Sequence, residues 1–174
     1  GEPFVKSCIA GLTADASAAA TSDAKERFGS LAFVVTGIQQ TATFDALDVT
    51  ISVVDEDGLE QTWSGEVLCV LVGNSRKFTN QLGQANVEDG LFDVTLVKEM
   101  PPSERVTEAI AQQLLGWDTE HVTRLKAQQL KIEGTEPIDF SLDGETHTHD
   151  RLTLSVRPGV LSMAVGPDYE PDPE

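Results

Sequence analysis

Apolar residues along much of this chain recur at every second position, the spacing of a β-strand with one buried face. The clearest example is 47–53, where aliphatic residues alternate with Asp, Thr and Ser. A hairpin turn signal, Asp-Glu-Asp-Gly, follows at 55–58, and 59–63 begin a return strand. Residues 66–72 are almost wholly apolar, which predicts a strand buried on both faces.

The same signals predict further strands, two of them separated by Asp143-Gly144 and two by Pro158-Gly159. These strands are expected at 4–9, 91–97, 122–133 with a bend, 138–142, 151–156 and 160–165.

Helical spacing is rarer. It predicts two short helices within 13–40 and a third that starts at Pro101 and stops at Gly116. Most other connections have hairpin length, so we expect a mainly β domain of eight or nine mostly antiparallel strands. This pattern favours a two-sheet β-sandwich over 1–166, followed by an acidic tail at 167–174.

The strong negative charge of the chain disfavours electrostatic attraction of some classes of binding partner. The 174 residues include 29 Asp and Glu against 12 Lys and Arg, a formal net charge of −17. Nucleic acids and anionic membrane surfaces are recognised through clustered Lys and Arg, so neither is expected to bind through charge. Adaptation to high salt explains this composition best, and an ordinary acidic cytosolic protein is the alternative.

Both cysteines lie in apolar runs, so we expect Cys8 and Cys69 to be buried, reduced thiols. The sequence shows no signal peptide and no apolar run of about 20 residues. We therefore expect a cytoplasmic protein, or one peripheral at the membrane.

Two acidic turns could carry chemistry. Asn86 to Asp93 places three carboxylates around a glycine, where a hard cation could bind, although a solvated acidic turn is the alternative. Asp143-Gly144-Glu145 could act as a general base or hold a metal-bound water, although Asp-Gly is also the commonest hairpin turn.

His147 and His149 would share a face of a strand, so a transition-metal site is conceivable, with a solvated loop as the alternative. The sequence contains no Walker-type phosphate loop, GxGxxG, GxSxG or HExxH motif. The motifs alone therefore do not supply a complete set of catalytic residues for any familiar reaction.

The order in which several short motifs follow one another along the chain is more specific for a protein family than any single motif. The succession consists of 25–33 (KERFGSLAF), 72–78 (VGNSRKF), 88–94 (EDGLFDV), 142–145 (LDGE) and 157–159 (RPG). It resembles the C-terminal half of the diacylglycerol kinase catalytic family, which is related to sphingosine kinases and NAD kinases. The resemblance covers roughly 4–166.

The resemblance implies a second domain. In that family a nucleotide-binding N-terminal domain carries a Gly-Gly-Asp-Gly-Thr motif, which this sequence lacks. The C-terminal domain is a β-sandwich, and the active site lies in the cleft between the two domains. The last strand usually returns to the first domain, so 160–165 would lack its neighbours here.

The resemblance also assigns roles to the two acidic turns. It implies a metal bound by the Asp89 carboxylate and by the backbone carbonyls of Asn86 and Leu91. It implies Glu145 as the catalytic acid/base or the partner of a metal-bound water, with Asp143 as a supporting carboxylate. Glu88 stands where the family has a first Asp.

We therefore expect the C-terminal domain of an ATP-dependent lipid kinase that uses Mg²⁺, inactive without its nucleotide-binding domain. The alternatives are a non-enzymatic β-sandwich interaction module and part of a NAD-kinase-like enzyme. A Gly-Gly-Asp-Gly-Thr motif upstream of Gly1 in the natural protein would exclude the module.

The charge generates a direct prediction. Molar KCl should raise the thermal melting midpoint above its value in dilute buffer, because screening weakens repulsion among the 29 acidic residues. A midpoint that stays constant or falls as KCl increases would contradict salt adaptation.

Overall fold

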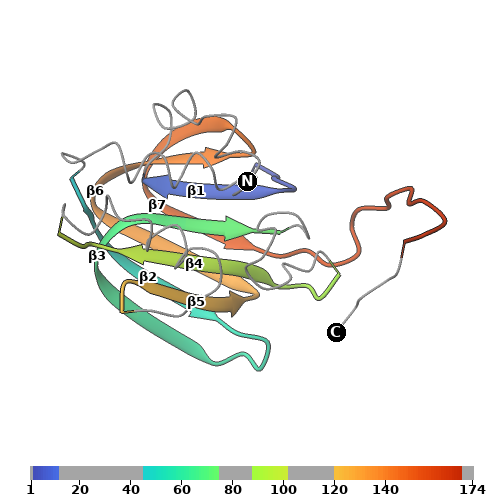
Figure 1. Ribbon diagram of the computed structural model, residues 1–174, viewed down its shortest axis with the longest axis horizontal. Coiled ribbons are helices and arrows are strands. Elements are labelled where there is room, and N and C mark those ends of the chain that lie inside the picture. The colour runs from blue at the N-terminus through green and yellow to red at the C-terminus, as the bar shows by residue number, and fades with distance from the viewer. Residues whose placement is uncertain (1, 12–44, 75–87, 102–119, 170–174) are drawn as a thin grey trace.

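The computed structural model describes residues 2–11, 45–74, 88–101 and 120–169, and within these ranges it contains seven strands and no helix (Figure 1). Every strand pair is antiparallel, as expected from the short connections. The strands are β1 (Ser7–Gly11), β2 (Leu47–Val54), β3 (Glu60–Gly73), β4 (Phe92–Lys98), β5 (Val122–Ala127), β6 (Gln129–Leu142) and β7 (Glu145–Ser155).

The sheet closes on itself because its two longest strands each pair with the same two neighbours. The strand order is β1-β6-β2-β3-β4-β5, with β7 added to β6 and with β1 also paired to β3. Strand β2 pairs with 60–67 of β3 and 129–134 of β6. Strand β1 pairs with 69–73 of β3 and 140–142 of β6. The result is a barrel-like sandwich rather than two separate sheets.

The hydrophobic core fills this closed sheet. The alternating residues of β2 meet the apolar half of β3 and the inward residues of β4 and β6. Phe140 is the largest side chain that is completely buried. Its replacement by alanine would cost about 3–5 kcal/mol, the usual range for an aromatic residue in a protein core.

Strand β6 must bend where it changes partner from β2 to β1. The register between β6 and β7 shifts between Glu133 and Ile138, which marks a bulge. A Cβ atom on Gly134 would lie 2.5 Å from the Glu136 carbonyl oxygen and 2.7 Å from Cδ1 of Ile138. Only glycine therefore fits this bend without displacing the backbone.

Several sequence predictions are confirmed. The 55–58 turn forms with a hydrogen bond from the Gly58 N–H to the Asp55 carbonyl oxygen, 3.2 Å. Both cysteines are buried, free thiols. Burial raises the pKa of Cys69 to about 12, and burial followed by the charge of Asp143 raises the pKa of Cys8 to about 12. Both thiols are therefore protonated at neutral pH.

Other boundaries need correction. Segments 122–133 and 138–142 form β5 and one long β6, and the strand expected at 151–156 extends back to Glu145 as β7. The three helices expected within 13–40 and 101–116 fall almost wholly outside the described residues, as does most of the acidic tail. The described ranges include no helix long and apolar enough to cross a membrane.

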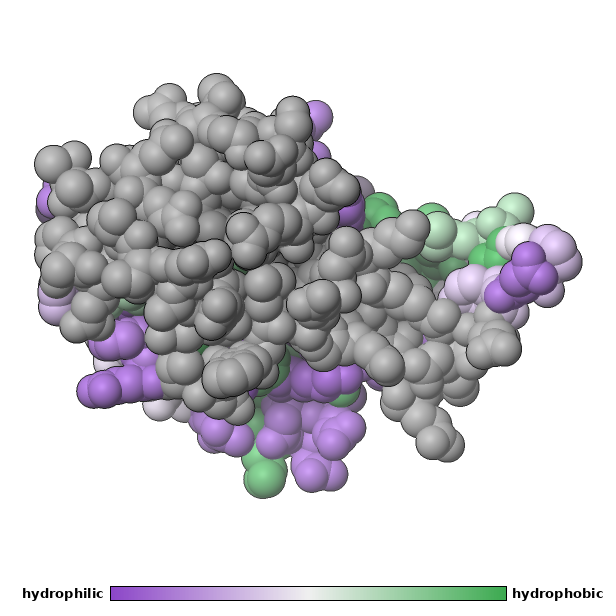
Figure 2. All heavy atoms as spheres, in the orientation of Figure 1, coloured by the Kyte–Doolittle hydropathy of each residue, from purple (hydrophilic) through white to green (hydrophobic). Residues whose placement is uncertain are grey.

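The strand expected at 160–165 is wrong, because these residues have no regular structure. They form a projection on which Figure 2 shows hydrophobic surface, at the right of the view. Its large apolar side chains are more than half exposed, namely Val160, Leu161, Met163 and Val165. An apolar sequence is not sufficient for a strand when no neighbouring strand supplies backbone partners.

The bend in β6 generates a prediction. Gly134→Ala should lower the free energy of unfolding by about 1–3 kcal/mol, because the added methyl group overpacks a closed site. Gly166→Ala is the matched control, since a Cβ atom there would meet nothing within 4 Å beyond its chain neighbours. Chemical denaturation measures both, and equal stability of the two variants would show that the bend tolerates a side chain.

Candidate functional site

The Asp89 turn leads into strand β4. Gly90 has a φ of 72°, which favours glycine, and a Cβ atom there would lie 3.1 Å from Cγ of Pro158. The Asp89 Oδ1 atom accepts a hydrogen bond of 2.9 Å from the Leu91 N–H. The carboxylate thus holds the turn closed, as Asp often does two residues before such a donor.

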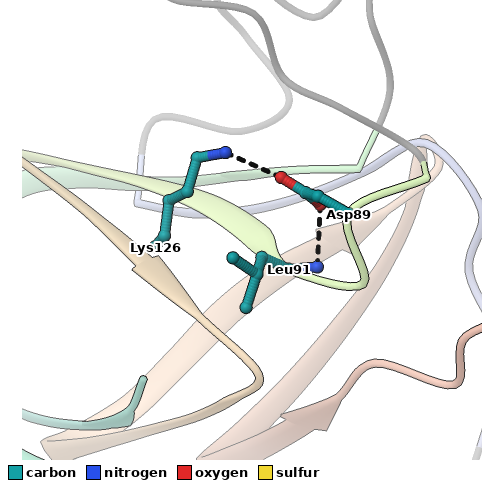
Figure 3. A network of polar contacts seen from close by, with 3 residues as sticks. All are labelled: Asp89, Leu91 and Lys126. Carbon is teal, nitrogen blue, oxygen red and sulfur yellow. Dashed lines mark hydrogen bonds and ion pairs between the residues drawn. The ribbon is translucent and has the colours of Figure 1, made fainter. Parts of the chain in front are cut away.

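The second oxygen of Asp89 has a cationic partner on strand β5. The Lys126 Nζ atom lies 2.7 Å from Asp89 Oδ2 (Figure 3). The Asp89 side chain is only 5% exposed, against 48% for Lys126. This hydrogen bond is the main cause of the raised pKa of Lys126; burial opposes the shift, and the charges of Asp89, Asp93 and Glu56 add to it.

The Mg²⁺ ion implied for this turn fits the described residues poorly. Asp89 uses one oxygen for Leu91 and the other for Lys126, and the Leu91 N–H points toward the carboxylate. Asn86 lies outside the described residues. Within those ranges, no group of three or more His, Cys, Asp or Glu could hold a metal ion. The roles of Asp89, Asn86 and Leu91 as metal ligands therefore stay predictions.

The Asp143 turn joins β6 to β7 as a tight hairpin. Asp143 and Gly144 both have positive φ, 49° and 101°, as a type I′ turn requires. The Asp143 carboxylate accepts hydrogen bonds from the N–H groups of Val5, Lys6 and Ser7, at 2.7, 2.9 and 2.8 Å. The hairpin is thereby fastened to the segment that leads into β1.

These bonds also set the ionisation of Asp143. Burial would raise the pKa of Asp143, but the three N–H donors and the charge of Lys6 outweigh it and hold the pKa below its usual value. Asp143 is therefore ionised at neutral pH, and its carboxylate has a clear role in the fold.

Glu145 is the first residue of β7, opposite Leu142, and its side chain is exposed. The two candidate residues of this hairpin therefore differ: Asp143 bonds to the backbone, whereas Glu145 faces solvent. A catalytic role for either residue stays a prediction.

Strand register connects the two acidic turns through one row of paired residues across the sheet. Ser7, which donates to Asp143, pairs with Gly73, and Gly73 pairs with Asp93. Asp93 in turn pairs with Lys126, which contacts Asp89. From Ser7 to Lys126 this strip spans three strand spacings, roughly 14 Å.

A ring contact supports the same placement. The rings of Phe4 and Phe92 stack with centroids 5.6 Å apart, so the segment before β1 lies against the start of β4. We call this row of residues, from Asp143 through Ser7, Gly73, Asp93 and Lys126 to Asp89, the acidic strip.

The histidine pair lies on strand β7, so the solvated-loop interpretation is wrong. His147 and His149 share a face with ring centroids 6.3 Å apart, and the His147 Nδ1 atom lies 3.4 Å from Glu2 Oε2. Their proposed role as metal ligands gains no support, because no group of three or more His, Cys, Asp or Glu among the described residues could hold a metal ion.

Sequence reasoning missed Lys126. The ion pair depends on the register between β4 and β5, and its partners are 37 residues apart. It also missed the hydroxyl of Tyr169, which donates a hydrogen bond of 2.8 Å to Glu88 Oε1. No local sequence signal could have identified either pair.

Known proteins resemble this chain in sequence. One is the probable lipid kinase YegS-like of Pseudomonas aeruginosa, 28% identical over 168 residues, which cover 94% of this chain and 53% of that protein. Another is the probable lipid kinase YegS-like of Stenotrophomonas maltophilia, 29% identical over 146 residues, or 80% of this chain and 45% of that protein. The chain thus spans about half the length of these curated relatives.

Solved structures share the fold. A protein described as a proposed diacylglycerol kinase from Bacillus anthracis strain Sterne superposes with a TM-score of 0.64 at 21% identity, over 90% of this chain and 51% of that one. A second structure of a protein so described gives a TM-score of 0.61 at 22% identity, over 91% and 55%.

The family match covers almost the whole chain. Residues 6–165 match the family described as the YegS C-terminal NAD kinase β-sandwich-like domain. The resemblance inferred from the order of the motifs is thereby confirmed, and the closed antiparallel sheet agrees with it. This chain belongs to the family of YegS C-terminal, NAD-kinase-like β-sandwich domains.

Proposed function

We propose that this chain is the C-terminal domain of an ATP-dependent lipid kinase and forms one wall of an active site between two domains. The observation that carries the proposal is the acidic strip, a row of paired residues that connects the two turns that the family resemblance marks as functional. The names of the relatives support a lipid kinase, and their greater length leaves room for a nucleotide-binding domain.

In this proposal the absent domain binds most of the ATP, and Mg²⁺ bound with the nucleotide would neutralise phosphate charge. The lipid hydroxyl oxygen forms a bond to the γ-phosphorus while the bond from that phosphorus to the bridging oxygen of ADP breaks. The Glu145 carboxylate accepts the hydroxyl proton, for which its exposed position at the edge of β7 is suited. Asp143 orients this turn through its bonds to the backbone.

The exposed projection at 160–165 suits the proposed partner domain. Its base is held beside the Asp89 turn, because Pro158 packs near Gly90 and Tyr169 bonds to Glu88. Four large apolar side chains between these points face solvent. We propose that the nucleotide-binding domain covers them and supplies backbone partners, so that the two domains meet beside the acidic strip.

The proposal is tested by assaying the two-domain protein with ATP and a panel of acceptors: diacylglycerol, a sphingoid base and NAD. Phosphorylation of a lipid acceptor, together with no turnover by this domain alone, is the expected result. Transfer to NAD would favour the NAD-kinase-like alternative, and no transfer to any acceptor would favour an interaction module.

Replacement of the proposed base should separate activity from stability. In the two-domain protein, Glu145→Gln should lower the rate of lipid phosphorylation about 10²–10⁴-fold, the usual loss for a general base. The melting midpoint should stay nearly constant, because the side chain is exposed. A variant that loses stability but keeps its rate would show that Glu145 is structural.

Asp143→Asn should behave in the opposite way at neutral pH. It removes the charge that accepts three N–H donors, so the domain should lose about 1 kcal/mol, a value reduced to allow for solvent exposure. Because the pKa of Asp143 is lowered, this stabilisation is present above the ordinary carboxyl pKa of about 3.9 and is lost as the pH falls through the lower native pKa.

The melting midpoints of the wild type and of Asp143→Asn should therefore differ at pH 7, and the difference should shrink as the pH falls from about 4 through the lower native pKa of Asp143. Thermal melts across this range measure the difference, with Glu145→Gln as the control on the same hairpin. A difference that is independent of pH would exclude the charge of Asp143 as the cause.

A further inference from the structure

The Asp89 carboxylate is buried enough to need a cation. Its side chain is 5% exposed, and an ionised carboxylate removed from water is costly unless it is paired and hydrogen-bonded. The Leu91 N–H donates a hydrogen bond to Oδ1 and closes the turn, but this neutral donor does not balance the negative charge of the carboxylate. The Oδ2 atom is therefore the place where a cation contributes most.

We propose that the ammonium group of Lys126 is the resident cation of the Asp89 turn and makes the conformation of the turn independent of divalent metal ions. Figure 3 shows the lysine reaching from β5 to the carboxylate on the neighbouring loop. Its Nζ atom lies 2.7 Å from Oδ2, a normal length for a charge-assisted hydrogen bond.

The pairing of β4 with β5 fixes the position of Lys126 beside the Asp89 turn. Lys126 lies directly opposite Asp93 in the register of β4 and β5, and Asp93 follows the Asp89 turn along the chain. The ammonium of Lys126 contacts the Asp89 carboxylate and also feels the negative charge of Asp93. The Lys126 side chain as a whole is about half exposed while its ammonium pairs with the buried oxygen of Asp89.

The hydrogen-bonding groups around Asp89 suit an ammonium ion better than a divalent metal ion. Mg²⁺ takes six oxygens in near-octahedral geometry at about 2.0–2.1 Å, and it usually keeps several waters. Leu91 already occupies one oxygen of Asp89, and the ammonium occupies the position facing the other. A divalent ion that bound this carboxylate would lie close to the Lys126 ammonium, and the repulsion between the two cations would oppose its binding. The inference concerns the turn alone and does not depend on the kinase proposal.

The test compares three variants of the purified protein that contains this chain: Lys126→Met, Asp89→Asn and the double substitution. Lys126→Met keeps most of the stem and removes the charge, so it should lower the melting midpoint by about 2–6 °C, because Asp89 is left buried without its cation. In the Asp89→Asn background the same substitution should have a much smaller effect, because the charge that needs a cation is gone.

Metal titrations complete the test. Millimolar MgCl₂ or CaCl₂ should shift the wild-type midpoint no more than KCl of the same ionic strength, and EDTA should leave it constant. A saturable stabilisation of the wild type by Mg²⁺ or Ca²⁺ that Asp89→Asn abolishes would overturn the proposal in favour of a metal site. A Lys126→Met midpoint equal to that of the wild type would also overturn it, and Arg151→Met on exposed β7 controls for loss of positive charge.

Discussion

The double pairing of β3 and β6 is the constraint on which the described structure depends. Each of these 14-residue strands hydrogen-bonds to both β1 and β2, and this closes the sheet around its core. Closure requires β6 to bend at Gly134, where a side chain would collide with the backbone. It also places the short strand β1 between β3 and β6, so that the segment before β1 meets the β6–β7 hairpin.

The acidic strip follows from this closure. Its two turns each contain an aspartate whose charge the fold uses: three backbone N–H groups hold Asp143, and one N–H and the Lys126 ammonium hold Asp89. In a chain with a net charge of −17, such local compensation keeps acidic groups close together without strong repulsion. The exposed Glu145 lies beside this fixed frame, where we propose that the chemistry takes place.

Much of the strand content could be predicted from the sequence, because alternation of apolar residues reports directly on burial at 47–53 and 66–72. Strand ends were harder: Gly134 and its register shift made one long strand resemble two. The apolar segment 160–165 was predicted as a strand from its hydrophobicity alone, whereas the family resemblance already implied that its pairing partners would be missing. The family resemblance identified both turns, whereas the Lys126–Asp89 pair depends on strand register and could not be predicted locally.

The central claim is that strand closure brings the Asp89 and Asp143 turns onto one strip, and a distance measurement tests it most directly. Nitroxide labels at Glu88 and Glu145, in a background without Cys8 and Cys69, would be measured by pulsed electron spin resonance. Glu145 on β7 is four strand spacings from β4, through β6, β1 and β3, or about 19 Å along the sheet. Together with the label arms, these spacings predict a narrow distribution centred at roughly 20–30 Å. A broad distribution, or one centred beyond about 35 Å, would contradict the shared strip.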